Sequence, residues 1–208
     1  LVNSPNNPTG AVFSRAILQR IVELAQRYNV LIVTDEVYEH LTFDDAQHIP
    51  LATLPGAWER TITISSAGKT FSTTGWKIGW ATAPAELISA ILTVKQYLTF
   101  VNGAPFQPAI ARGLRLPDTF YRDIASTLQH KRDILVEGLS DAGLEVYSPS
   151  GTYFVLANTT PVGYDDATGL SRELGEKVGV VGVPVTAFVS SGHAAHYRSL
   201  LRFAFCNR

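Results

Sequence analysis

The sequence predicts an α/β fold in which a sheet with flanking helices is followed by a smaller α+β unit. Two apolar, largely β-branched runs, at residues 30–34 and 61–65, are typical of strands buried on both faces. Between residues 14 and 28, apolar side chains recur every three or four positions behind Ser14, which predicts an amphipathic helix with a serine N-cap. Strand, helix and strand in this order favour a sheet whose ligands bind beyond the carboxyl ends of the strands.

The remaining elements follow in chain order. Two prolines and Gly10 make residues 4–10 a rigid loop after a short strand at residues 1–3. Further elements are expected as strands at 78–83, 144–147, 153–157 and 200–205, and as helices at 85–100, 109–116, 118–142 and 168–178. Gly143 is expected to close the longest of these helices. The long helices in the middle of the chain predict a bridge between two lobes.

Composition and charge exclude several classes of protein. The 208 residues are 46% hydrophobic and 17% charged, and 17 Lys and Arg against 18 Asp and Glu give a net charge of -1. This balance provides no basic surface for a nucleic acid, so we expect no such partner. Neither a membrane span nor a signal peptide is visible, so we expect no membrane partner and a cytoplasmic location. The single Cys206 excludes an internal disulfide.

Metal-ligating patterns are also missing from the sequence. Only His193 and His196 have a spacing that could ligate a metal, so we expect no metal site and place all five histidines at the surface. Cys206 ends an apolar run and is expected to be a small buried side chain. The chain has no Met and begins as if inside a strand, so we expect it to be an internal fragment of a longer protein.

A lysine directly after a predicted strand, Lys69, is compatible with three kinds of chemistry. A phosphate-binding Walker A loop needs a glycine at position 63, where this chain has Thr63. Ser66 and Lys69 have the spacing of a serine–lysine acyl transferase, but the Ser-Asp-Asn and Lys-Thr-Gly motifs of such enzymes are absent. The third option is a lysine that forms a Schiff base with a cofactor, which also needs an acid, hydrogen-bond donors and a phosphate site.

Residues of those types stand at the ends of other predicted strands and loops. Asp35 ends the run 30–34, and a carboxylate at such a position needs a cationic partner or donors to offset its desolvation. Tyr38 and Asn7 could both donate to one side of a ring, while Ser66 and Lys77 flank Lys69 with a hydroxyl and a second cation. Taken singly, each also has an ordinary interpretation as a turn, packing or surface residue.

Four sequence blocks then carry a resemblance to a known family. They are residues 3–10 (NSPNNPTG), 34–38 (TDEVY), 65–71 (SSAGKTF) with 75–80 (GWKIGW), and 202–205 (RFAF). In this order they resemble the class I/II, pyridoxal 5'-phosphate (PLP)-dependent aminotransferases of fold type I. Through residues 36–41, 95–97 and 103–108 the chain most resembles the actinobacterial N-succinyldiaminopimelate aminotransferases, followed by the kynurenine and methionine aminotransferases.

The resemblance implies a domain organisation. Residues 1–112 would form the C-terminal part of a large PLP-binding domain, with part of its mixed sheet, flanking helices and bridging helices. Residues 113–208 would form a small α+β domain that lacks its usual final helix. The N-terminal half of such enzymes would be missing from this chain. The full-length protein would be a homodimer.

The resemblance also implies catalytic roles for three residues. Lys69 would carry PLP as a Schiff base and move a proton at the substrate Cα. Asp35 would keep the pyridine nitrogen of PLP protonated. Tyr38 would donate a hydrogen bond to the phenolate oxygen of the cofactor ring.

Binding roles follow in the same way. Asn7 would share the phenolate oxygen with Tyr38 and contact the substrate, while Ser66 and Lys77 would bind the cofactor phosphate. Arg202 would hold the substrate α-carboxylate in a bidentate fork that lysine cannot reproduce.

The resemblance leaves the reaction itself open between several candidates. The expected function is transfer of an amino group from an amino-acid donor, such as N-succinyl-diaminopimelate in lysine biosynthesis, to 2-oxoglutarate or a related 2-oxo acid. A methionine or kynurenine aminotransferase, a carbon–sulfur β-lyase on the same scaffold, and an aminotransferase-like regulatory module are the alternatives.

Overall fold

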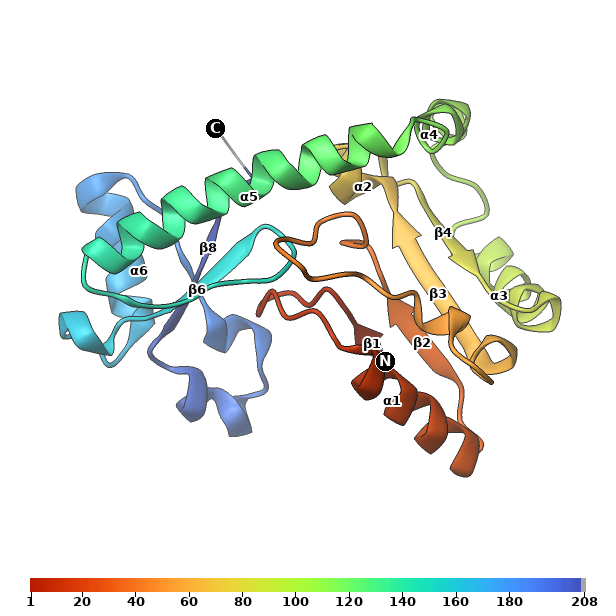
Figure 1. Ribbon diagram of the computed structural model, residues 1–208, viewed down its shortest axis with the longest axis horizontal. Helices are drawn as coiled ribbons and strands as arrows, with labels where there is room; N and C mark the ends of the chain where they lie inside the picture. Colours follow the sequence, from red (N-terminus) through yellow and green to blue (C-terminus); the bar gives the residue numbers. More distant parts are fainter. Residues whose placement is uncertain (207–208) are drawn as a thin grey trace.

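The computed structural model describes residues 1–206 and contains two four-stranded sheets joined by helices (Figure 1). The first sheet has the order β1-β2-β3-β4 and the second the order β5-β6-β8-β7. The strands are β1 (Val2–Asn3), β2 (Ile32–Asp35), β3 (Thr61–Ser66), β4 (Gly79–Thr82), β5 (Glu145–Tyr147), β6 (Phe154–Asn158), β7 (Val183–Pro184) and β8 (Leu200–Ala204). The helices are α1 (Arg15–Arg27), α2 (Ala67–Thr70), α3 (Ala85–Leu98), α4 (Gln107–Gly113), α5 (Asp118–Asp141) and α6 (Ala167–Val178).

The first sheet is mixed, because β1, β2 and β3 are parallel and β4 is antiparallel. Helix α1 covers it through Leu18, Val22 and Ala25, which pack with Ile32 of β2. As predicted, the Ser14 hydroxyl caps this helix by accepting a hydrogen bond from the backbone of Ile17, at 3.4 Å. The predicted α/β class is therefore confirmed.

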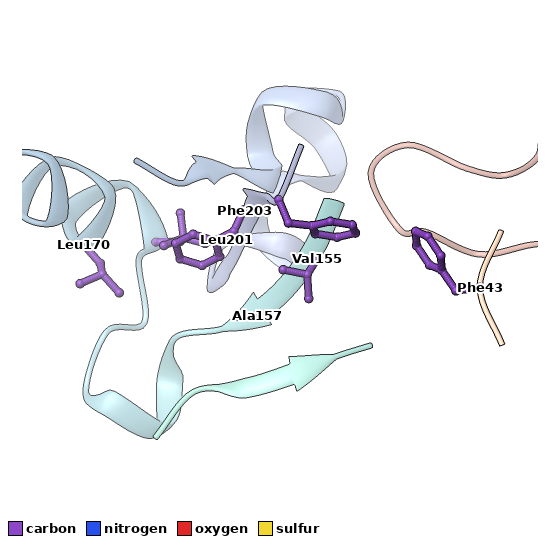
Figure 2. Close-up of a cluster of buried hydrophobic side chains, with 8 residues drawn as sticks. Phe43, Val155, Ala157, Leu170, Leu201 and Phe203 are labelled. Atoms are coloured by element: carbon purple, nitrogen blue, oxygen red, sulfur yellow. The ribbon is translucent and has the colours of Figure 1, made fainter. Parts of the chain in front are cut away.

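The second sheet is antiparallel, and its strands β6 and β8 contribute to the largest apolar core cluster (Figure 2). Val155 and Ala157 of β6 and Leu201 and Phe203 of β8 are almost completely buried there. Leu170 of α6 packs against the same cluster. This core fixes β8, which carries one of the predicted site residues.

Helix α5 runs alongside both sheets and is the longest element of the fold (Figure 1). It ends where the sequence predicts, because Gly143 takes the left-handed conformation with φ of 88° and its N–H donates to the Ser140 carbonyl. The boundary at residues 112/113 stays a prediction, although the two sheets lie on either side of it.

Loops that follow β2 and precede β6 are joined by backbone hydrogen bonds. The backbone N–H of Phe43 donates to Ser150, and the N–H of Thr152 donates to Leu41, both at 2.9 Å. A side chain at Gly151 would place its Cβ 2.9 Å from the Leu41 carbonyl oxygen, so only glycine allows this approach. These hydrogen-bonded loops bring the end of β2 next to the start of β6.

Several elements differ from the sequence prediction, among them the helix expected at 109–116, which is observed as α4 (Gln107–Gly113), and two of the strands. Residues 30 and 31 precede β2, and both are exposed. The Val30 N–H donates to the Ala25 carbonyl in the turn after α1, so the strand begins only after this turn. Strand β7 pairs with β8 although nothing in its short sequence indicated a strand. Among the described residues, no helix combines the length and apolar character that a membrane crossing requires.

Candidate functional site

The loop after β1 is organised by the side chain of Asn3. Its Nδ2 donates to the Asp35 carbonyl at 2.9 Å, and its Oδ1 accepts a hydrogen bond from the Asn7 backbone at 3.0 Å. Asn3 and Asp35 are register partners in the parallel pair β1–β2. The amide of Asn3 thus fixes Asn7 at the carboxyl edge of the first sheet.

Arg202 reaches this loop from the second sheet. Its Nη1 donates to the Asn7 Oδ1 at 2.7 Å, which joins residues 195 positions apart. No carboxylate forms an ion pair with Arg202 among residues 1–206. Burial lowers the pKa of the guanidinium below its ordinary value, whereas the neighbouring Tyr38 and Tyr153 oppose this shift. The group is therefore partly desolvated and still has donors for an incoming anion.

Tyr38 lies near both Lys69 and Arg202. Tyr38 is only 3% exposed, and its ring contacts Tyr153 edge to face at a centroid distance of 5.4 Å. The Lys69 Nζ lies 5.8 Å from the Tyr38 ring centroid and 5.9 Å from that of Tyr153. Burial, reinforced by Tyr153, raises the pKa of Tyr38 above its ordinary value, so the hydroxyl remains protonated and able to donate near neutral pH.

A cavity of about 620 Å³ continues from Lys69 along β3 and β4. Ser66 and Lys77 line it together with Lys69. Gly68 and Thr74 complete this end, where a Cβ on Gly68 would come within 3.2 Å of the Thr74 Cα. The cavity thus combines hydroxyl groups and lysine side chains with a largely apolar remainder, and Ser66, Lys69 and Lys77 are among its polar lining residues.

Asp35 ends β2, at the edge where the loop of Asn7 begins. Its Oδ1 accepts a hydrogen bond from the backbone of Val37 at 3.3 Å, and its charge acts on nearby Tyr38. The structure therefore places Tyr38 near both Asp35 and Arg202, and Arg202 in contact with Asn7. It places Ser66 and Lys77 around the cavity, and Lys69 connects the two groups.

The sequence did not single out several residues that shape this site. Asn3 positions the loop of Asn7, and Tyr153 packs against Tyr38. Phe154 and Phe188 both lie against the guanidinium of Arg202. Asn3 lies within the motif block at residues 3–10 and Tyr153 within the predicted strand 153–157, but neither pattern indicated these contacts.

Two expectations about titratable and sulfur side chains were wrong. The His48 side chain is only 8% exposed, and its Nε2 lies 2.9 Å from a carboxylate oxygen of the buried Glu36. The loop carrying His48 folds back onto Glu36, directly after β2, and the Leu51 N–H also donates to this carboxylate. Cys206 is exposed because β8 ends at Ala204 and leaves it outside the core.

A cluster of possible metal ligands surrounds this histidine. Atoms of Glu36, Glu39 and His48 lie within 4.8 Å of one another. Each acid is already engaged, since Glu36 bonds to His48 and Leu51 and Glu39 accepts from the Ser65 hydroxyl at 2.8 Å. These bonds fasten the segment of Asp35 and Tyr38 to neighbouring loops, so the geometry gives the cluster a structural role.

Comparison with known proteins places this arrangement among its relatives. The family described as aminotransferase class I and II matches residues 1–208. A probable N-succinyldiaminopimelate aminotransferase from Mycobacterium tuberculosis is 50% identical over 214 residues, covering 100% of this chain and 54% of the relative. A kynurenine–oxoglutarate transaminase from Dictyostelium discoideum is 40% identical, covering 99% of this chain and 52% of the relative.

Solved structures agree with these matches. The N-succinyldiaminopimelate aminotransferase from Mycobacterium tuberculosis has a TM-score of 0.95 and 51% identity, covering 100% of this chain and 53% of that chain. An Escherichia coli protein with a methionine aminotransferase function has a TM-score of 0.92 and 33% identity, covering 100% and 54%. The chain spans about half the length of the relatives it matches. By its sequence over residues 1–208 and by its fold, it belongs to the class I and II aminotransferase family.

Proposed function

We propose that the full-length protein is a PLP-dependent aminotransferase that moves an amino group from an amino acid to a 2-oxo acid. The observation that carries this proposal is the convergence of Lys69, Tyr38 and Arg202, from three separate elements, on one site. Family membership supports it, because enzymes of this family use PLP. The resemblance of the motifs to this family is thereby confirmed.

The side chains of the site fit the chemical groups of PLP. Asp35 offers a carboxylate for a cationic ring nitrogen, and Tyr38 offers a protonated hydroxyl for an anionic ring oxygen. Ser66 and Lys77 line the same cavity as Lys69, where a phosphate dianion would find a donor and a cation. No ion pair of Lys69 with an acid occurs within residues 1–206, which leaves its amine available to the cofactor.

Each residue then has a distinct task in catalysis. When bound, PLP supplies an electron-poor ring that withdraws negative charge from the substrate Cα. Asp35 favours a proton on the ring nitrogen, which strengthens that withdrawal. The Lys69 amine takes a proton from one carbon and returns it to another, as a general base and acid. Arg202 holds the substrate carboxylate and orients the reacting carbon toward Lys69.

N-succinyl-diaminopimelate is the amino donor that we favour. The 50% identity to a probable N-succinyldiaminopimelate aminotransferase supports this choice and a place in lysine biosynthesis. Kynurenine and methionine are the next candidates, because relatives with those printed activities are 40% and 33% identical. Parallel assays with these three donors and 2-oxoglutarate would rank them, and product analysis with cystathionine would detect a β-lyase.

Assembly and location form the last part of the proposal. We expect a homodimer in the cytoplasm, without nucleic-acid or membrane partners. An apolar surface on and after α3 supports association, since Tyr97, Leu98 and Phe100 are at least 76% exposed. The domain division at residues 112/113 belongs to the same proposal, with the two sheets on either side as its support.

The substitution Arg202→Lys tests the carboxylate role in the full-length protein. It keeps the charge but loses the bidentate geometry, so kcat/KM should fall. If one charged hydrogen bond is lost, the fall corresponds to a loss of about 1.5 to 3 kcal/mol in transition-state stabilisation. Stopped-flow measurement of each half-reaction should show this fall for both the amino donor and the oxo acid, because both carry the carboxylate. A fall for only one of the two would refute this role.

A further inference from the structure

The guanidinium of Arg202 lies between two phenylalanine rings. Its Cζ is 4.0 Å from the ring centroid of Phe154 and 4.3 Å from that of Phe188. Two rings this close to one carbon would touch each other if they lay on the same side. The ring partners of Phe154 are Tyr38 and Tyr153, and Phe188 is not among them in the described chain. The two phenylalanine rings therefore lie on opposite sides of the guanidinium carbon.

Strand pairing brings both rings to Arg202. Phe154 pairs with Ala204 across the antiparallel β6–β8 ladder, so it is a diagonal neighbour of Arg202 on the same face of the sheet. On the other side of β8, Val183 of the short strand β7 is the register partner of Arg202. A 3-10 turn, η5 (Val185–Phe188), follows directly and returns Phe188 to the guanidinium.

Aromatic rings that stack on both sides of a guanidinium leave only the edge of its plane accessible. One edge donor is already used, because Nη1 donates to Asn7 at 2.7 Å. The remaining N–H groups of an arginine point outward in the same plane. A carboxylate must then approach in that plane, which is the geometry of a bidentate fork–fork pair.

We propose that Phe188 is a positioning residue that, with Phe154, holds Arg202 ready for in-plane binding of the substrate carboxylate. This inference rests on the proposed function, in which Arg202 binds that carboxylate. Phe188 is 43% exposed and lies outside the main core clusters, whereas Phe154 is 8% exposed and packs with Tyr38 and Leu41. Phe188 can therefore be substituted without opening a core cavity.

The test compares Phe188→Leu, which keeps apolar volume but removes the ring, with Phe188→Tyr, which keeps the ring. A matched control is Tyr197→Leu, at a residue 39% exposed in the neighbouring 3-10 segment η6 (Ser191–Tyr197). All variants are made in the full-length protein, and circular dichroism verifies their folding. Calorimetry measures the Kd of 3-phenylpropionate, a carboxylate without an amino or oxo group, and steady-state assays give KM and kcat.

For Phe188→Leu we expect the Kd of the probe and the KM of both substrates to rise about two- to thirty-fold, the range that cation–π energies correspond to. The kcat at saturation should change less, and Phe188→Tyr and Tyr197→Leu should resemble the wild type. Equal Kd and KM values for Phe188→Leu and wild type, or no binding of the probe by wild type, would overturn the inference. A raised Kd for Phe188→Leu without any transamination by the wild type would support the positioning role of Phe188 and refute the proposed function.

Discussion

Arg132 joins α5 to loops from both halves of the chain, and its replacement by lysine provides a test of what holds them together. The side chain is only 6% exposed. Its Nη1 and Nη2 donate to the two carboxylate oxygens of Asp44 at 2.6 and 3.1 Å, and Nη1 also donates to the Pro149 carbonyl at 3.1 Å. Nε donates to Asp133 at 2.8 Å. A single ammonium group cannot make all of these bonds at once.

The expected cost follows from the groups that lose a partner in Arg132→Lys. One charged hydrogen bond contributes about 1.5 to 3 kcal/mol, and a buried carbonyl left unpaired at Pro149 costs about 1 to 3 kcal/mol. The Asp44 side chain is 58% exposed, so water screens its interaction with Arg132. The lower part of the range for a charged hydrogen bond therefore applies to this ion pair. We therefore expect the free energy of unfolding to fall by about 2 to 4 kcal/mol.

Urea denaturation at neutral pH, followed by circular dichroism, measures this change. Asp133→Asn is the control, because the Asp133 side chain is 55% exposed and its loss should cost less than about 0.5 kcal/mol. A loss below about 0.5 kcal/mol for Arg132→Lys would refute the idea that Arg132 holds the halves together.

The same ion pair predicts a pH dependence. The hydrogen bond from Arg132 lowers the pKa of Asp44 in the folded state below its ordinary value. Its contribution to stability is thus fully present above the unfolded pKa of about 3.9 and is lost as the pH falls through the lower folded pKa. The difference between wild type and Arg132→Lys should shrink over that range of acid pH.

Three further predictions concern the cofactor residues in the full-length protein. Lys69→Ala should abolish the visible absorption of the lysine-bound cofactor, and borohydride reduction with peptide mapping should label Lys69 in the wild type, whereas a label elsewhere would refute the assignment. Asp35→Asn should retain cofactor yet lose most turnover, because a neutral amide does not favour a protonated ring nitrogen. Lys77→Ala should mainly weaken cofactor affinity in equilibrium titrations, and near-normal turnover of Asp35→Asn at saturating cofactor would contradict the role of that carboxylate.

The sequence alone determined the elements that depend on local signals. The cap at Ser14 and the left-handed Gly143 mark helix ends through interactions within a few residues, and the structure has both helices where they were predicted. The motif residues Asp35 and Lys69 were recognisable because strand ends are legible from apolar runs followed by polar residues. The α/β class follows from these same signals, whereas the family resemblance rests on the motif blocks at residues 3–10, 34–38, 65–80 and 202–205.

Tertiary structure alone decided which residues surround the motif residues. Phe188 reaches Arg202 only because β7 pairs with β8, and a two-residue strand leaves no periodic pattern to read. His48 is buried by a loop that folds back onto Glu36, a contact between residues 12 positions apart. Such contacts depend on the path of the chain in space rather than on the propensity of any one segment. The sequence therefore named the chemical groups of the site, and folding determined the aromatic and amide residues that orient them.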